Sequence, residues 1–233
     1  MEQPQAIGRA LCFGGRLSLD TASLGGLQEN LDKLKDISSI LLVGVGSSYK
    51  AAIYGAKLFK HSGVFASVSA MDANATEESD FKQFTKKSQK SGLVALSQSG
   101  ETKEVISTVQ LAQRNMVPVM SVVNEVGSTL ATMTKCGVYT NAGHENAFLS
   151  TKTFTSQVVC LALMSMWFRQ TKGKEMNITK TDSTLAESLQ RLPITFGMLM
   201  RTQNVCKKAA KKLFSKEHCF VLGKGELQNG HNV

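Results

Sequence analysis

The sequence has few of the residues that mark unusual classes of protein. It contains three prolines and one tryptophan, and its five cysteines form no C-x-x-C pair. An odd number of scattered cysteines favours neither a disulfide framework nor a zinc site, so we expect a reducing compartment and no bound metal. Few prolines and 42% hydrophobic residues indicate a globular chain that is able to bury a core.

Long apolar runs are also missing. The longest, at residues 158–168, is too short to span a bilayer. The first ten residues, MEQPQAIGRA, lack the apolar centre of a signal peptide. We therefore expect a cytoplasmic protein with no membrane partner, and we interpret the glycosylation sequon at Asn177 as a chance match.

Acidic residues are scarce relative to basic ones: 18 against 27, for a formal net charge of +9. Much of the excess lies in one C-terminal segment that contains Lys207, Lys208, Lys211, Lys212 and Lys216. Helical spacing places the first four opposite Val205, Ala209 and Leu213. Because no aromatic or Arg/Gly residues are interleaved with them, the pattern favours a solvated helix face, and we expect no nucleic-acid partner.

Apolar runs alternate with helical patterns along most of the chain. The predicted strands are residues 37–45, 64–70, 93–96, 117–123 and 137–139. This order predicts an α/β fold, a three-layer αβα sandwich with a parallel sheet of about five strands and flanking helices. A polar helix is expected over residues 71–90. We divide the chain into a helical lead-in (1–36), a central domain (37–172) and a C-terminal part (173–233).

The central stretch, LVALSQSGETKEV at residues 93–105, predicts a strand, a hydroxyl-rich turn and a helix that begins at Glu101. Backbone N–H groups at a helix start have no partner within the helix and carry the positive end of its dipole, so they attract anions. Gly100 would let the backbone approach a ligand closely. The side chains able to donate hydrogen bonds there are Ser97, Gln98, Ser99 and Thr102. The stretch fits a phosphate site, although an ordinary N-cap remains open from spacing alone.

Two further predicted helices begin at hydroxyl-bearing residues, in the segments GVGSSY (44–49) and STK (150–152). The first lacks both the third glycine of a dinucleotide fingerprint and the lysine of a P-loop, so nucleotide binding is not supported. Ligands of parallel sheets lie at the carboxyl ends of strands where the winding reverses. We expect Ser47, Ser48 and residues 97–102 at that edge. Lys152 could screen a phosphate or lie at the surface, and we interpret His144 as a surface residue.

The motifs GSSY, SQSGET and STKTFTSQ, together with the opening EQPQAI and the loop AGxE, resemble one family. They are similar to the sugar isomerase (SIS) domain, specifically the first of the two such domains in glutamine:fructose-6-phosphate aminotransferases. The resemblance runs from Glu2 to about Gly223. It implies a flavodoxin-like sheet, no cofactor, and a homodimer formed through the SIS domain.

The same resemblance implies a sugar-phosphate ligand, fructose-6-phosphate or glucosamine-6-phosphate. The implied contacts are Ser48, Ser97, Gln98, Ser99, Thr102 and Ser150, with Ser97, Ser99 and Thr102 on the phosphate. Phe148 and Leu149 depart from the small residues that the family has before its STK motif. Residues 218–223 resemble the opening strand of a second SIS domain, and we assign no role to His231 in the segment that follows.

No catalytic residue is assigned to this chain. In the family, an N-terminal cysteine releases ammonia from glutamine, and the isomerising acid/base groups belong to the second SIS domain and the C-terminal tail. We expect this chain alone to lack both sets. The expected function is the phosphosugar-binding part of an aminotransferase that makes glucosamine-6-phosphate for UDP-N-acetylglucosamine synthesis. A non-catalytic sugar-phosphate module and a stand-alone phosphosugar isomerase remain the alternatives.

Overall fold

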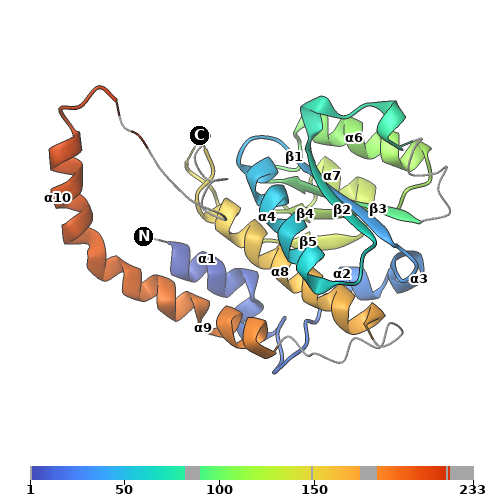
Figure 1. Ribbon diagram of the computed structural model, residues 1–233, viewed down its shortest axis with the longest axis horizontal. Coiled ribbons are helices and arrows are strands. Elements are labelled where there is room, and N and C mark those ends of the chain that lie inside the picture. The colour runs from blue at the N-terminus through green and yellow to red at the C-terminus, as the bar shows by residue number, and fades with distance from the viewer. Residues whose placement is uncertain (1, 82–89, 148, 174–182, 219, 221–233) are drawn as a thin grey trace.

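The protein is built on a five-stranded sheet. The computed structural model describes residues 2–81, 90–147, 149–173, 183–218 and 220. All strand pairs are parallel, in the order β2-β1-β3-β4-β5. The strands are β1 (Ser39–Gly44), β2 (Ser67–Asp72), β3 (Ser91–Ser97), β4 (Val119–Val123) and β5 (Gly137–Tyr139). Helices cover both faces of this sheet, so the predicted αβα sandwich is confirmed (Figure 1).

The winding of the sheet reverses between β1 and β3. The chain passes from β1 outward to β2, then returns to β3 on the other side of β1 and continues to β4 and β5. The helices that follow β1 and β3, α4 (Ser47–Ser62) and α6 (Lys103–Arg114), therefore pack on opposite faces. Val43 pairs with Ala95, so the two strands end side by side. The turns after β1 and β3 flank the point where doubly wound sheets bind ligands.

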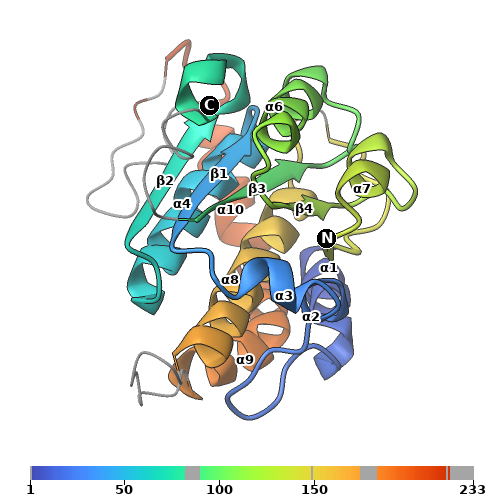
Figure 2. The same ribbon diagram turned by 90° about the vertical axis from the view of Figure 1, so that its right-hand side faces the viewer.

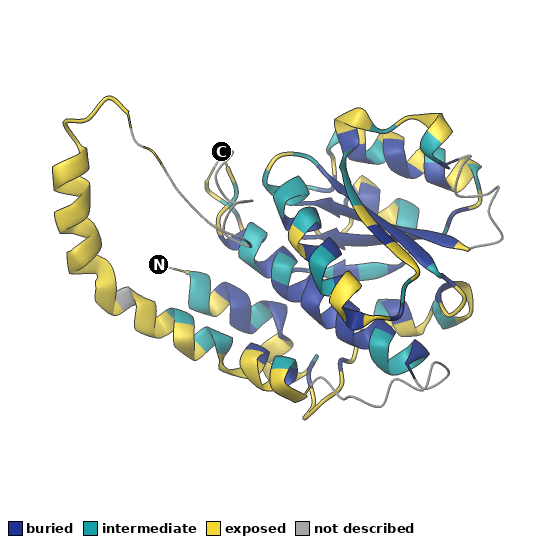
Figure 3. Ribbon diagram, in the orientation of Figure 1, coloured by how far each residue is buried: buried dark blue, intermediate teal, exposed yellow. Residues whose placement is uncertain are grey.

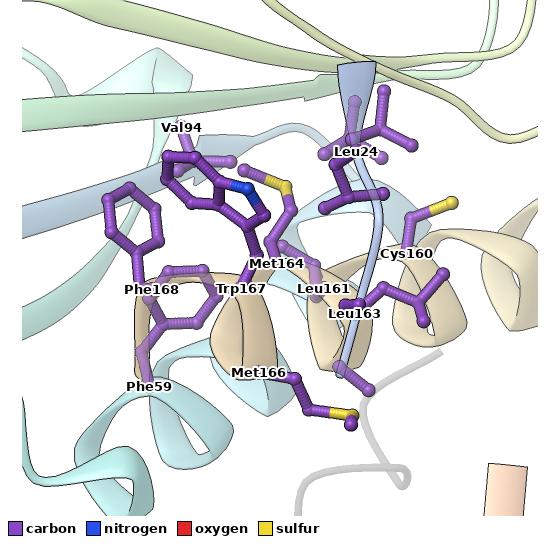
Figure 4. Close-up of a cluster of buried hydrophobic side chains, with 14 of the residues drawn as sticks. Leu24, Phe59, Val94, Cys160, Leu161, Leu163, Met164, Met166, Trp167 and Phe168 are labelled. Atoms are coloured by element: carbon purple, nitrogen blue, oxygen red, sulfur yellow. The ribbon is translucent and has the colours of Figure 1, made fainter. Parts of the chain in front are cut away.

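One face of the sheet is covered by α4 and α8 (Lys152–Lys172), and α1 (Gln3–Ala10) packs on α8. Trp167 and Phe168 of α8 are fully buried there, with ring centroids 5.1 Å apart, and Phe59 of α4 lies 6.0 Å from Phe168 (Figure 4). The apolar run at residues 158–168 is thus part of a core helix. Among the residues that the structure describes, no helix combines the length and the hydropathy needed to cross a membrane.

The other face is covered by α6 and α7 (Thr129–Thr134) (Figure 2). Successive side chains of a strand point to opposite faces. Val94 accordingly packs on the α4 side of β3, while Leu93 and Ala95 pack on the α6 side. The same alternation turns Ser97, at the end of β3, toward α6.

The N-terminal lead-in packs against the core through several short helices. It contains α1, η1 (Cys12–Gly14), α2 (Gly25–Gln28) and α3 (Leu31–Leu34). The spacing of Leu27, Leu31 and Leu34 predicts one helix face, but the helix is interrupted at Asn30, whose side-chain amide donates to the Gly26 carbonyl at 2.9 Å. Leu27 and Leu34 are nevertheless buried.

Two predicted helix starts are wrong, because contacts with other elements decide where these helices begin. The helix expected from residue 71 begins later, because β2 continues its pairing with β1 as far as Gly44 and Asp72. A short helix, η2 (Ala73–Ala75), follows, and helical residues resume at Glu78. α6 begins at Lys103 rather than at Glu101, whose side chain bonds to another helix.

The C-terminal helices are α9 (Ser183–Leu199), η3 (Met200–Thr202) and α10 (Gln203–Leu213). α9 packs on α1 and buries Ala186 and Leu189, whereas every residue of α10 is exposed (Figure 3). The lysine face of α10 is therefore exposed as predicted, but so are Val205 and Leu213 opposite it. Most of the predicted strand at 218–223, and all of residues 225–231, lie outside the described residues. The domain boundaries at 36 and 172 remain predictions.

Candidate functional site

The turn after β3 is organised by its own hydroxyl groups. Ser97 is 2% exposed, and its Oγ accepts a hydrogen bond from the Gly100 N–H at 2.9 Å. Ser97 Oγ also shares a hydrogen bond with Thr102 Oγ1 at 3.0 Å, which occupies one of their two protons. Ser99 Oγ accepts from the Glu101 N–H at 3.1 Å. Within the part of the chain that the structure describes, the Ser99 proton has no acceptor, so it remains able to donate.

The start of α6 is open. Thr102 occupies the N-cap position but makes no capping hydrogen bond, because its hydroxyl is bonded to Ser97. The ordinary N-cap alternative is therefore wrong for Thr102. The first N–H groups of a helix have no partner within the helix and carry its positive partial charge. The turn thus presents backbone donors and hydroxyl protons around one point.

Gly100 and Glu101 fasten this turn to α7. Gly100 has φ +70°, and its carbonyl accepts from the Leu130 N–H at 3.0 Å. The Glu101 carboxylate accepts from the Thr129 N–H and from the Thr129 hydroxyl, each at 2.7 Å. These hydrogen bonds, the backbone one foremost, lower the pKa of Glu101 below its ordinary value. The side chain is thus a carboxylate at neutral pH and is directed at α7.

The turn after β1 presents a second open helix start. Gly46 precedes α4 with φ +57°, and no side chain caps the helix. Ser47 Oγ donates to the Leu149 carbonyl, which holds the loop before α8 against the start of α4. Ser48 Oγ accepts from Nε2 of Gln157 at 3.0 Å, and Gln157 is 1% exposed on α8. The buried amide thereby leaves the Ser48 proton to point elsewhere.

The start of α8 is already occupied by an anion of the protein itself. The Glu145 carboxylate accepts from the N–H groups of Thr151 at 2.9 Å, Thr153 at 3.1 Å and Ala147 at 3.2 Å. Burial opposes the charge of Glu145, but these hydrogen bonds outweigh it and lower its pKa. The three helix starts that carry hydroxyl groups therefore differ in their ability to bind an anion. The first N–H groups of α4 and α6 are not capped by a side chain, whereas those of α8 already donate to Glu145.

Lys152 does not lie at the surface, which was one of the two roles left open by the sequence. It is 7% exposed, and its Nζ forms an ion pair with Glu2. The hydrogen bond and the charge of Lys152 lower the pKa of Glu2. Lys152 therefore joins α8 to the N-terminal segment instead of lying at the surface. His144 is exposed, as interpreted from the sequence.

Comparison with known proteins identifies the family. The SIS domain family matches residues 33–166, more than half of the chain. The chain belongs to the SIS domain family. A glutamine–fructose-6-phosphate aminotransferase [isomerizing] from Chlorobaculum tepidum is 30% identical over 224 residues, which are 96% of this chain and 35% of that protein. A relative of the same name from Arabidopsis thaliana is 29% identical over 96% of this chain and 32% of its own length.

Solved structures show the same fold. The C-terminal domain of glucosamine-fructose-6-phosphate aminotransferase from Francisella tularensis has a TM-score of 0.80 at 22% identity, over 98% of this chain and 61% of that one. A putative phosphosugar isomerase from Clostridium difficile has a TM-score of 0.68 at 16% identity, over 92% and 56%. This SIS domain chain spans about a third of the length of the curated relatives above.

The predicted site residues of this SIS domain gather at the carboxyl edge of its sheet. Residues 97–102 follow β3, and Ser48 follows the neighbouring strand. Ser150 lies next to the loop residue that Ser47 holds, in a left-handed conformation with φ +53°. The Gln98 carbonyl accepts from the Asn124 N–H at the end of β4. The structure thus groups all six residues around the switch point, and whether they contact a ligand remains a prediction.

Three residues of this edge were not recognised from the sequence, namely Glu101, Glu145 and Gln157. Two of them lie within the motifs SQSGET and STKTFTSQ, and the third is the glutamate of AGxE. The only signal in the sequence for these three residues was that each is a polar residue inside one of the motifs. Their roles depend on partners in other elements, which spacing alone does not reveal.

A separate cavity of about 300 Å³ lies at the β5 side of the SIS domain, between α2 and α7. None of the predicted site residues lines it. Its lining residues are Gly26, Ser121, Val123, Ala131, Lys135, Cys136, Gly137, Val138 and Tyr139. Among the described residues there is no group of three or more acidic, cysteine or histidine side chains that could hold a metal.

Replacing Glu145 by Ala should destabilise the SIS domain in a pH-dependent way. Loss of a helix cap typically costs about 0.5 to 2 kcal/mol, which we expect at neutral pH. Because the folded-state pKa of Glu145 is lowered, its stabilisation is present above the ordinary value of 4.5 and disappears as pH falls through the folded-state pKa. Chemical denaturation at several pH values should show the difference between wild type and variant narrowing in acid.

The matched control for this experiment is Glu29→Ala, which removes an exposed glutamate at the end of α2. It should change the free energy of unfolding much less than Glu145→Ala does at neutral pH. An equal loss of stability in both variants would contradict a capping role for Glu145.

Proposed function

We propose that this SIS domain binds a hexose 6-phosphate, with the phosphate at residues 97–102 and the sugar toward Ser48 and Ser150. The observation that carries the proposal is the uncapped start of the 12-residue helix α6, which directly follows the hydroxyl-bearing turn at the switch point. Hydrogen bonds to an ionised acceptor are roughly twice as strong as neutral ones. A neutral set of donors is thus sufficient for phosphate, and an arginine is not required.

Fructose-6-phosphate is the ligand that we propose. The curated relatives are named for this substrate, and they match almost the whole of the chain. We infer that the chain supplies the fructose-6-phosphate site of an isomerising aminotransferase that makes glucosamine-6-phosphate. Homodimerisation through the SIS domain stays an expectation from the family resemblance.

Calorimetric titration tests this function. Purified protein is titrated with fructose-6-phosphate, glucose-6-phosphate, fructose and ATP in the same buffer. We expect the hexose phosphates to bind and fructose to bind far more weakly, because the phosphate accepts most of the charge-assisted hydrogen bonds. Preferential binding of ATP, or equal binding of fructose and its phosphate, would contradict the proposal.

A further inference from the structure

Glu101 is an unexpected residue for a turn that binds an anion. A carboxylate near a bound phosphate repels it, and an electrostatic cost of this kind needs a compensating role. Both carboxylate oxygens are used: Oε1 accepts from the Thr129 N–H and Oε2 from the Thr129 hydroxyl, each at 2.7 Å. Hydrogen bonds from α7 therefore stabilise the negative charge of the Glu101 carboxylate.

The backbone of the same residue acts on the donor set. The Glu101 N–H donates to Ser99 Oγ at 3.1 Å. A hydroxyl that accepts from one side directs its proton elsewhere, so this contact limits the directions in which Ser99 donates. Glu101 thus connects a predicted phosphate donor with α7 through a single residue.

Contacts beside Glu101 make this connection rigid. The Gly100 carbonyl accepts from the Leu130 N–H at 3.0 Å. The α-carbon of Gly100 lies so close to Ser128 that an added Cβ would stand 2.2 Å from the Ser128 Oγ. Three consecutive residues at the start of α7, Ser128 to Leu130, therefore contact Gly100 or Glu101.

We propose that Glu101 is a positioning residue for the phosphate: its clamp on Thr129 holds the turn so that the hydroxyls of Ser99 and Thr102 converge on the ligand. This inference rests on the proposed function, because it assigns the phosphate to this turn. It is distinct from a purely structural role, in which Glu101 caps α7 and contributes to stability alone. The two roles differ in what happens to ligand affinity in a fully folded variant.

The test compares fructose-6-phosphate affinity in Glu101→Ala, Glu101→Gln and Thr129→Val, at a temperature where each variant is folded. Outer-shell hydrogen-bond partners of metal ligands typically contribute about tenfold to a hundredfold in affinity, and by analogy we expect Glu101→Ala to weaken binding about tenfold. Thr129→Val keeps the backbone N–H and should weaken binding less. Glutamine can keep both contacts with Thr129 while removing the charge, so Glu101→Gln should restore wild-type affinity or exceed it.

The matched control is Thr134→Val, the same substitution at the opposite end of α7, where the hydroxyl bonds to Ser121 and to the Leu130 carbonyl. It should leave affinity unchanged even if it lowers the melting temperature. Wild-type affinity in folded Glu101→Ala would overturn the positioning role and leave phosphosugar binding intact. Failure of the wild-type protein to bind any hexose phosphate would instead overturn the proposed function, and this inference with it.

Discussion

Replacing Ser99 by Ala should lower the affinity for fructose-6-phosphate by about tenfold to a hundredfold, because a hydrogen bond to a charged group contributes about 1.5 to 3 kcal/mol. The Ser99 hydroxyl accepts from the Glu101 N–H and keeps its proton for a ligand. Fold stability should change much less, because Thr102 and not Ser99 occupies the N-cap position of α6. Titration calorimetry and chemical denaturation of the same preparation measure the two quantities.

Ser107→Ala provides the control for this variant. Ser107 lies in α6 and is exposed, so the substitution removes the same group from the same helix away from the turn. It should affect neither affinity nor stability. A Ser99→Ala protein that is destabilised and yet binds normally would return Ser99 to a structural role and remove it from the proposed site.

Replacing Gly100 by Ala should strongly lower the stability of the fold. Its φ of +70° is unfavourable for a residue with a side chain, and the added Cβ would stand 2.2 Å from Ser128 Oγ and 2.9 Å from Val123 Cγ2. A left-handed backbone costs about 1 to 2 kcal/mol and overpacking about 1 to 3 kcal/mol, so we expect a loss of about 2 to 5 kcal/mol. Urea denaturation measures this loss.

Gly127→Ala separates the two causes. Gly127 has φ +77°, but an added Cβ would meet no atom within 4 Å. This variant should therefore lose only the backbone part, about 1 to 2 kcal/mol. Equal losses in both variants would show that the contact between Gly100 and Ser128 is relieved by small movements and does not constrain the turn.

The sheet was predictable because its strands are short apolar runs with a distinct pattern. Strands buried on both faces are rich in apolar residues throughout, and the Gly/Ser turns after β1 and β3 mark where they end. The boundary of β2 was not predictable, because its last residues are strand only through their pairing with β1. These residues are 71 and 72, and the polar residues that follow them in the sequence predict a helix.

At the site, the sequence located the hydroxyl groups but not the network that holds them. Ser97, Ser99 and Thr102 lie in one motif, so their proximity follows from local spacing. The pairing of Lys152 with Glu2 joins residues that are far apart in the sequence. The glutamate that caps α8 was also missed, because a carboxylate in a loop has no periodic pattern that points to its partners.

The packing of α8 predicts that the turn after β1 and the turn after β3 differ in how readily they open. The first turns of this helix hold Ser48 through Gln157, and its later turns carry Trp167 and Phe168 in the centre of the core. Regions that open locally are those with few buried apolar contacts. α8 has many, so we expect the amide hydrogens of its central turns to exchange only on global unfolding. The turn at residues 97–102 is held to α7 through the exposed side chains of Glu101 and Thr129. We therefore expect its amide hydrogens to exchange faster than those of α8.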